Sequence, residues 1–304
     1  MNSQFGSGLL RLADPRISLA SISSFVLGTT AAWADGPLRP GWSLVTLLGL
    51  LLLETAKNAS GELVDFDSGA DQAVPAEDRS PFSGGKRVLV DGALDRRQVI
   101  GIALVTYSLG IAVGLSIVLG REGAVLFIGA VGVALAYFYH APPLSLSYRG
   151  LGELAVALVY GPLICCGTYL VQRNDITWAP VLVSLPLGIL IGAFLWINEF
   201  PDRRSDEAVG KKTLVVRLGA RRASRIFALL IALAYGILLV LPAFGLPREV
   251  WIGFGGLPHA IVAARRLHAS PENTARLVPA QKWTLLSFLL LAAGTSLGVM
   301  VSAG

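Results

Sequence analysis

The sequence predicts an all-α protein, a polytopic membrane bundle of about nine transmembrane helices. Three observations support this fold class. First, 54% of the 304 residues are hydrophobic and only 15% are charged, whereas a soluble domain carries about 25% charged residues. Second, the apolar residues gather into windows of about 20 residues, the length that crosses a bilayer as a helix. Third, Lys and Arg residues are concentrated in alternate connecting segments, as the positive-inside rule expects. We expect one integral domain, 1–304, embedded in the lipid bilayer, with a flexible N-terminal segment at 1–15.

The apolar windows can be assigned in chain order. They are 17–34, 42–64, 98–119, 122–140, 152–171, 179–199, 223–244, 249–265 and 283–302. The window 249–265 is short and contains Pro258 and His259. It is therefore the least regular of the set.

The distribution of positive charge sets the orientation. With the N-terminus in the cytoplasm, only Arg39, Arg121, Arg173 and Arg248 of the 25 Lys and Arg residues lie on the outer side. The remaining 21 lie on the cytoplasmic side, as expected for a multi-pass protein of a prokaryotic inner membrane. The net charge of +5 therefore follows membrane topology. It gives no reason to expect nucleic-acid binding.

A first acidic cluster follows the second window. Asn58, Glu62 and Asp65 are spaced i, i+4, i+7, so that they share one helix face, and Asp71 lies in the loop beyond Gly69. Carboxylates next to a bilayer are costly and need a function. Hard oxygen ligands of this kind suit Mg²⁺, which takes one or two carboxylates together with water and substrate phosphate. A solvated acidic cap is the alternative for this cluster alone.

A second cluster follows the sixth window, with Asn198, Asp202 and Asp206 at i, i+4, i+8. Pro201 lies inside this pattern and predicts either a kink or a helix break at Phe200. The pattern predicts that both clusters hold a shared cation on the cytoplasmic side, with Asn58, Glu62, Asp65, Asp71, Asn198, Asp202 and Asp206 as ligands.

Basic residues next to the clusters suit a diphosphate. The candidates are Lys86, Arg87, Arg203, Lys211 and Lys212. Ordinary positive-inside loops and anchoring at the membrane surface are the alternatives.

Taken together, these motifs closely resemble the UbiA superfamily of intramembrane prenyltransferases. The second cluster leads into Gly210-Lys-Lys-Thr213-Leu, as in that superfamily. Between the clusters, the segment Tyr139-His-Ala-Pro-Pro to Tyr148-Arg-Gly-Leu-Gly-Glu153 resembles the branch that prenylates 1,4-dihydroxy-2-naphthoate in menaquinone synthesis. Two departures concern Glu62, where the superfamily usually has Asp, and Ser147, where many relatives have Lys before the Tyr.

The resemblance implies a UbiA-like helical bundle and a reaction. Mg²⁺, or Mn²⁺, would join the two clusters to an allylic polyprenyl diphosphate, with Asp65 and Asp202 acting in catalysis. Tyr139 would face the allylic cation, and Arg149 and Glu153 would bind an aromatic acceptor, foremost 1,4-dihydroxy-2-naphthoate. Other acceptors stay open: 4-hydroxybenzoate, homogentisate, a chlorophyll-type ring, haem or a glycerol-phosphate lipid.

A cation-coupled membrane transporter is the non-enzyme alternative, because acids inside membranes often mark ion paths. Transporter acids tend to lie near the bilayer midplane. Here both clusters are expected at one face, next to basic residues that suit phosphate.

Overall fold

The computed structural model describes residues 3–304, and this range is helical, without a named strand. The α-helices are α1 Ser3–Ala13, α2 Pro15–Ala34, α3 Pro40–Ser68, α4 Ala70–Ala73, α5 Arg96–Gly120, α6 Val125–Phe138, α7 Gly152–Leu158, α8 Ile164–Arg173, α9 Trp178–Ala208, α10 Leu214–Leu218, α11 Ala220–Val240, α12 Leu257–Ala269 and α13 Thr274–Ala303. Short 3₁₀ or π segments are η1 Ala76–Asp78, η2 Leu146–Tyr148, η3 Val159–Leu163, η4 Leu241–Phe244 and η5 Arg248–Gly256.

All the apolar windows coincide with helical segments, and the all-α membrane fold is confirmed. Within the described residues, six helical stretches are long and apolar enough to cross a membrane by themselves. The windows 42–64, 122–140 and 249–265 are not among them: they fall on α3, on the 14-residue α6, and on η5 with α12. The expected count of nine is therefore approximate.

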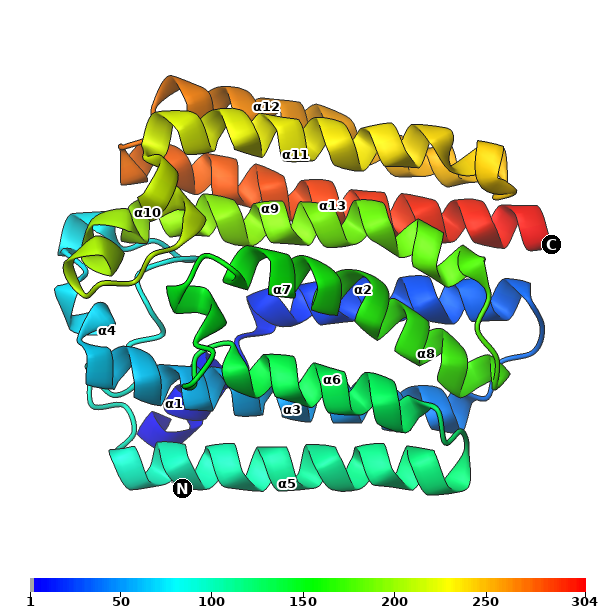
Figure 1. Ribbon diagram of the computed structural model, residues 1–304, viewed down its shortest axis with the longest axis horizontal. Helices are drawn as coiled ribbons and strands as arrows, with labels where there is room; N and C mark the ends of the chain where they lie inside the picture. The colour runs from blue at the N-terminus through cyan, green and yellow to red at the C-terminus, as the bar shows by residue number, and fades with distance from the viewer. Residues whose placement is uncertain (1–2) are drawn as a thin grey trace.

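The long helices lie side by side, with α11, α12 and α13 along one edge of the bundle and α3 and α5 along the other (Figure 1). Helix α9 runs through the interior, where Leu187, Leu190 and Ile197 are fully buried. By contrast, Leu119 and Phe127 are 86% and 75% exposed. Such apolar side chains on the outside are expected of a surface that faces lipid.

Close contact between helices brings α9 against the segment that joins α7 to α8. Gly161 has non-helical dihedral angles (φ −100°, ψ −105°) just before Pro162. A Cβ atom added to Gly161 would lie 2.7 Å from the Cα of Gly188 on α9. Only glycines permit this separation, so the pair fixes how α9 sits beside the central helices.

Local signals set the ends of the helices that carry the acidic clusters. Gly69, in the left-handed region at φ 81°, ends α3 and turns the chain into α4. Helix α5 begins with a capping box between Asp95 and Gln98. Helix α9 continues through Pro201 to Ala208, so the break at Phe200 that the sequence offered as one outcome is wrong. Contacts of α9 with α7, α11 and α13 hold it helical although Pro201 donates no backbone hydrogen bond.

The N-terminal segment is helical over the residues that the structure describes. Residues 3–13 form α1, and Leu12 is fully buried in a cluster with Ala59, Val88 and Leu94. Arg11 is paired with Asp91 at 2.8 Å. Apolar burial of Leu12 and this ion pair connect α1 to the rest of the bundle.

Candidate active site at the ends of α3 and α9

Both acidic clusters lie at the same end of the bundle, where α3 leads to α4 and α9 leads to α10 (Figure 1). Their side chains line a single cavity of about 700 Å³. All seven residues predicted as metal ligands are among those that line it: Asn58, Glu62, Asp65, Asp71, Asn198, Asp202 and Asp206. Two segments far apart in the sequence therefore share one polar cavity.

The first cluster is held by hydrogen bonds from several elements. Asn58 donates through its Nδ2 to the carbonyl of Leu12 at 2.9 Å, which leaves its own carbonyl for other partners. Glu62 accepts from the backbone N–H of Leu89 at 2.7 Å. Asp65 accepts from the Tyr148 hydroxyl at 2.9 Å. Each contact fixes a side chain while leaving oxygens that can face the cavity.

Asp71 reaches the cavity from α4 and is buried. Its carboxylate lies against Gly85, where an added Cβ would overlap it. Gly85 has φ +76°, a conformation that glycine adopts without strain. Burial, reinforced by the negative charges of Asp65 and Glu62, raises the pKa of Asp71 to about 7. An added cation would favour the ionised form of this carboxyl.

The second cluster presents oxygens that lack partners. Among the described residues, Asn198 Oδ1 and Asp202 Oδ1 are buried without a hydrogen-bond partner, and so is Glu199 Oε2. All three residues line the cavity. Buried polar atoms are normally satisfied, so these oxygens indicate a site for a cationic ligand.

Lys211 connects the two clusters. Its Nζ lies 3.4 Å from Asp206 Oδ1 and 4.0 Å from Asp65 Oδ1, and 5.4 Å from the centre of the Tyr148 ring. Burial opposes the charge of this ammonium, but Asp65 and Asp206 outweigh it and raise the pKa of Lys211 well above its usual value. Lys211 is therefore charged and holds the end of α3 to the end of α9.

The other predicted diphosphate ligands divide into two groups. Lys86 lines the cavity, with its Nζ 2.5 Å from Asp14 Oδ2. Arg87, Arg203 and Lys212 are not among the residues that line it. Arg87 donates to the backbone carbonyl of Asp71, Arg203 lies 3.9 Å from Glu207, and Lys212 is exposed.

The predicted acceptor ligands are also placed outside the polar cavity. Arg149 is exposed and donates to the carbonyl of Pro143 at 2.9 Å. Glu153 is buried and accepts from the backbone N–H of Leu214 at 2.8 Å. Neither side chain lines this cavity. Arg149 bonds within its own connecting segment, and Glu153 links α7 to the start of α10.

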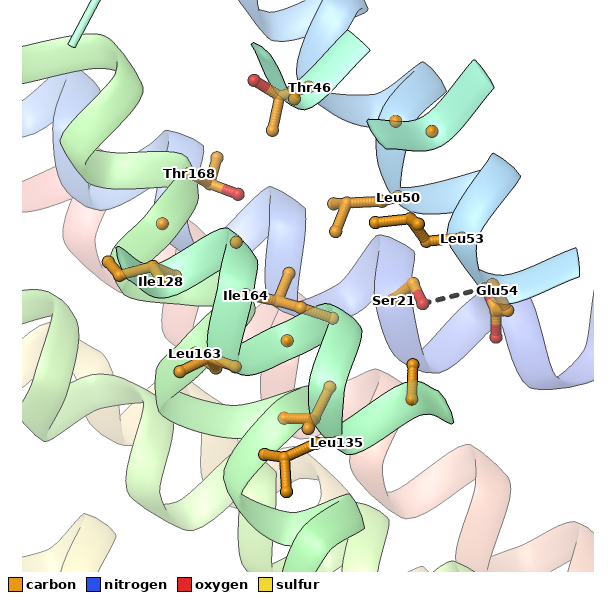
Figure 2. Close-up of a pocket in the computed structure, with 18 of the residues that line it drawn as sticks. Ser21, Thr46, Leu50, Leu53, Glu54, Ile128, Leu135, Leu163, Ile164 and Thr168 are labelled. Carbon is orange, nitrogen blue, oxygen red and sulfur yellow. Dashed lines mark hydrogen bonds between the residues drawn. The ribbon is translucent and has the colours of Figure 1, made fainter. Parts of the chain in front are cut away.

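A second, apolar cavity of about 180 Å³ adjoins the polar one. Figure 2 shows part of its lining. Its wall includes Leu50 and Leu53 of α3 and Leu163 and Ile164 around η3. Tyr139, Lys57, Val156 and Tyr160 line both cavities, so they mark the junction between them. The lining thus changes from carboxylates in the polar cavity to mainly aliphatic side chains in the apolar cavity beside it.

Sequence reasoning missed two residues of this junction, Lys57 and Tyr160, and also Glu54 of the apolar cavity. The signal was present, because Glu54 and Lys57 are ionisable residues inside an apolar window, and such residues are rarely without function. Figure 2 shows Glu54 hydrogen-bonded by Ser21, at 2.9 Å. Tyr160 also donates to Glu54, at 3.3 Å.

The oxygen atoms that line the polar cavity are of the kind that bind magnesium. Within residues 3–304, no three His, Cys, Asp or Glu side chains are close enough to form a ready metal cage. Mg²⁺ seldom uses such a cage, because it keeps several waters and takes few protein ligands beside substrate phosphate. Carboxylate and amide oxygens distributed over one cavity wall, some without partners, fit that mode of binding.

Comparison with known proteins places this geometry among prenyltransferases. The sequence model of the UbiA prenyltransferase family matches residues 21–288. The chain is 28% identical to 1,4-dihydroxy-2-naphthoate octaprenyltransferase of Bacillus subtilis over 98% of this chain and 93% of that protein. It is 30% identical to the Escherichia coli enzyme of the same name, over 76% of this chain and 74% of that protein. A UbiA homolog from Archaeoglobus fulgidus bound to GPP and Mg²⁺ superposes with a TM-score of 0.66 at 16% identity, covering 95% of this chain and 99% of that one.

Proposed function

Because this chain belongs to the UbiA prenyltransferase family, we propose that it transfers a polyprenyl group from an allylic polyprenyl diphosphate to 1,4-dihydroxy-2-naphthoate, as in menaquinone biosynthesis. The chain is an integral-membrane prenyltransferase with several membrane-spanning helices. The observation that carries the proposal is the cavity shared by two distant acidic clusters, which opens into an apolar space at Tyr139. A diphosphate with a hydrocarbon tail is the kind of ligand that needs both environments.

The diphosphate end of the donor is assigned to the polar cavity. Bound Mg²⁺, for which Mn²⁺ is a substitute, supplies positive charge to the leaving pyrophosphate. The carboxylates and amides of the two clusters would hold the ion and the diphosphate, with Asp65 contributed by α3 and Asp202 by α9. Lys211 and Lys86 add charge-assisted donors to the phosphate oxygens.

The reacting carbon is assigned to the junction. The bond between C1 of the prenyl group and the diphosphate oxygen breaks, and pyrophosphate leaves. The acceptor ring carbon forms the new bond to C1 and then loses its own substituent, as a proton or as CO2 from a carboxylate, so that the ring is aromatic again. Tyr139 lies at the boundary of the two cavities, where its ring face stabilises positive charge on the allylic carbons. The apolar cavity takes the first part of the prenyl tail and keeps bulk water away from the cation.

The site faces the cytoplasm in this proposal. The orientation follows from the excess of Lys and Arg in the loops that carry both clusters. No geometric observation favours the cation-coupled transporter, because the carboxylates gather at one end of the bundle.

The test is transfer by the purified protein in detergent, with polyprenyl diphosphate and each candidate acceptor, and with or without Mg²⁺. Asp65→Ala and Asp202→Ala should each abolish transfer. Asp67→Ala and Glu207→Ala are matched controls: these acids are 52% and 66% exposed, pair with Arg96 and Arg203, and do not line the cavity. Both controls should keep wild-type rates.

The outcomes test the cation site and the acceptor separately. Wild-type turnover in a folded Asp65→Ala or Asp202→Ala protein would exclude the shared cation site. Transfer to 4-hydroxybenzoate or homogentisate, and none to the naphthoate, would keep the prenyltransferase and replace the acceptor.

A further inference from the structure

Lys57 of α3 lies where the polar and apolar cavities meet. It precedes Asn58 by one residue, and its side chain lines both the polar and the apolar cavity. Its Nζ lies 5.7 Å from the centre of the Tyr139 ring and 5.8 Å from that of Tyr160, and 3.4 Å from the Tyr160 hydroxyl. A cation is therefore held between two aromatic rings at the point where the cavities meet.

Lys57 differs from the other cations of the polar cavity. Five cationic side chains line it, and four have a carboxylate within 4.0 Å: Arg11 with Asp91, Arg16 with Asp14, Lys86 with Asp14, and Lys211 with Asp206 and Asp65. Over residues 3–304, Lys57 has no such partner. Glu54 lies one turn away, but it accepts hydrogen bonds from Ser21 and Tyr160 instead.

Lys57 is partly buried. A cation that is partly removed from water and has no carboxylate within 4.0 Å is unfavourable unless a ligand supplies an anion. The anion that contacts Lys57 need not be the diphosphate. Lys86 and Lys211 lie among the acidic clusters, where they can bind the diphosphate instead. Lys57 instead stands at the mouth of the apolar cavity, beside two tyrosine rings. An aromatic carboxylate matches this combination, since its ring can pack on tyrosine faces while its charge meets the ammonium.

We propose that Lys57 binds the carboxylate of the aromatic acceptor at the junction of the two cavities, and so makes the enzyme specific for acidic acceptors. This inference rests on the proposed function and deepens it. Lys57 then takes the role that the sequence analysis gave to Arg149, which lies outside the polar cavity.

The test compares an acceptor with and without the carboxylate. In wild-type protein and Lys57→Met, one measures KM and kcat for 1,4-dihydroxy-2-naphthoate at saturating donor, and the inhibition constant of 1,4-dihydroxynaphthalene. A charge-assisted hydrogen bond predicts that Lys57→Met raises KM for the naphthoate roughly 10- to 100-fold. The inhibition constant of the analogue without a carboxylate should stay unchanged.

Further variants separate binding from folding. Lys57→Arg keeps the charge and should recover most of the lost affinity. Lys282→Met removes an exposed lysine on α13 and should behave as wild type in every assay. Thermal unfolding in detergent checks that each protein is folded.

Three outcomes would overturn the inference: an unchanged KM for the naphthoate in folded Lys57→Met, an equal loss for both compounds, or a rise in KM for the prenyl diphosphate alone. Failure of the wild-type protein to prenylate the naphthoate would instead refute the acceptor assigned under the proposed function. The two failures are therefore distinguished by the wild-type assay.

Discussion

Replacing Lys211 by methionine tests whether one ammonium holds the two acidic clusters together. Its Nζ lies 3.4 Å from Asp206 and 4.0 Å from Asp65. At an effective dielectric constant of about 20, these separations correspond to about 5 and 4 kcal/mol of attraction. Burying the ammonium cancels part of this gain, but removing one partner of a buried ion pair costs about 3–5 kcal/mol, because the other partner is left uncompensated.

Thermal unfolding in detergent, without Mg²⁺, is the assay. A loss of about 3–5 kcal/mol lowers the apparent Tm of Lys211→Met by roughly 10 °C for a chain of this size. Folding raises the pKa of Lys211. The contribution of its ammonium to folding stability is therefore complete below the usual lysine pKa of about 10.4, and it is lost only as pH rises through the raised pKa. The Tm difference should therefore be constant between pH 7 and 9.

The neighbouring Lys212 provides the control. It is exposed and does not line the cavity, so Lys212→Met should change stability by less than about 0.5 kcal/mol. Adding Mg²⁺ should narrow the gap between Lys211→Met and wild type, because a cation replaces part of the missing charge. A difference of 2 °C corresponds to about 0.5–1 kcal/mol for a chain of this size. A Tm for Lys211→Met within 2 °C of wild type in Mg²⁺-free buffer would therefore refute the electrostatic link between the clusters.

Two further predictions follow from the same region and from the helix contacts behind it. The pKa of Asp71 is raised from 3.8 to about 7, so its ionisation costs stability as pH rises from 3.8 to 7, and the cost stays constant above 7. Asp71→Asn should therefore stabilise the Mg²⁺-free protein by up to roughly 4 kcal/mol at pH 8 and not at pH 4, read from Tm; equal effects at both pH values would contradict the assignment. A Cβ on Gly188 would overlap the Ala157 carbonyl, so Gly188→Ala should cost about 1–3 kcal/mol. Gly236→Ala in α11, which meets no atom within 4 Å, should be neutral or stabilising; a similar Tm for the two variants would exclude the close contact.

Much of the fold could be predicted because its signals are local. Apolar windows of bilayer length and the Lys and Arg asymmetry need no knowledge of tertiary contacts. The i, i+4, i+7 spacing of Asn58, Glu62 and Asp65 likewise placed them on one helix face, and all three line the cavity. Pro201 predicted either a kink or a break at Phe200, and the break does not occur, because contacts with neighbouring helices override a local propensity.

The residues that sequence reasoning missed depend on distant contacts. Lys57 is one position from the predicted ligand Asn58, but its importance lies in Tyr139 and Tyr160, which belong to other elements. The same limit applied to the diphosphate candidates: five basic residues near the clusters looked alike, yet only Lys86 and Lys211 line the cavity. Proximity in the sequence therefore identifies the region of the site. Which basic side chain faces the cavity depends on the path of the chain after each helix.

The charges that line the polar cavity explain why the donor and cations belong together. Seven acids and five cationic side chains line it, so the cavity has a negative excess when all seven acids are ionised. A diphosphate entering alone would add to that excess in a cavity lined by Asp65 and Asp202, and like charges repel. Divalent cations would offset this repulsion, and they would also give partners to the oxygens of Asn198 and Asp202 that lack them. The acidic clusters therefore select a donor that arrives with cations, while the ammonium of Lys57, left without an acid, remains for the second substrate.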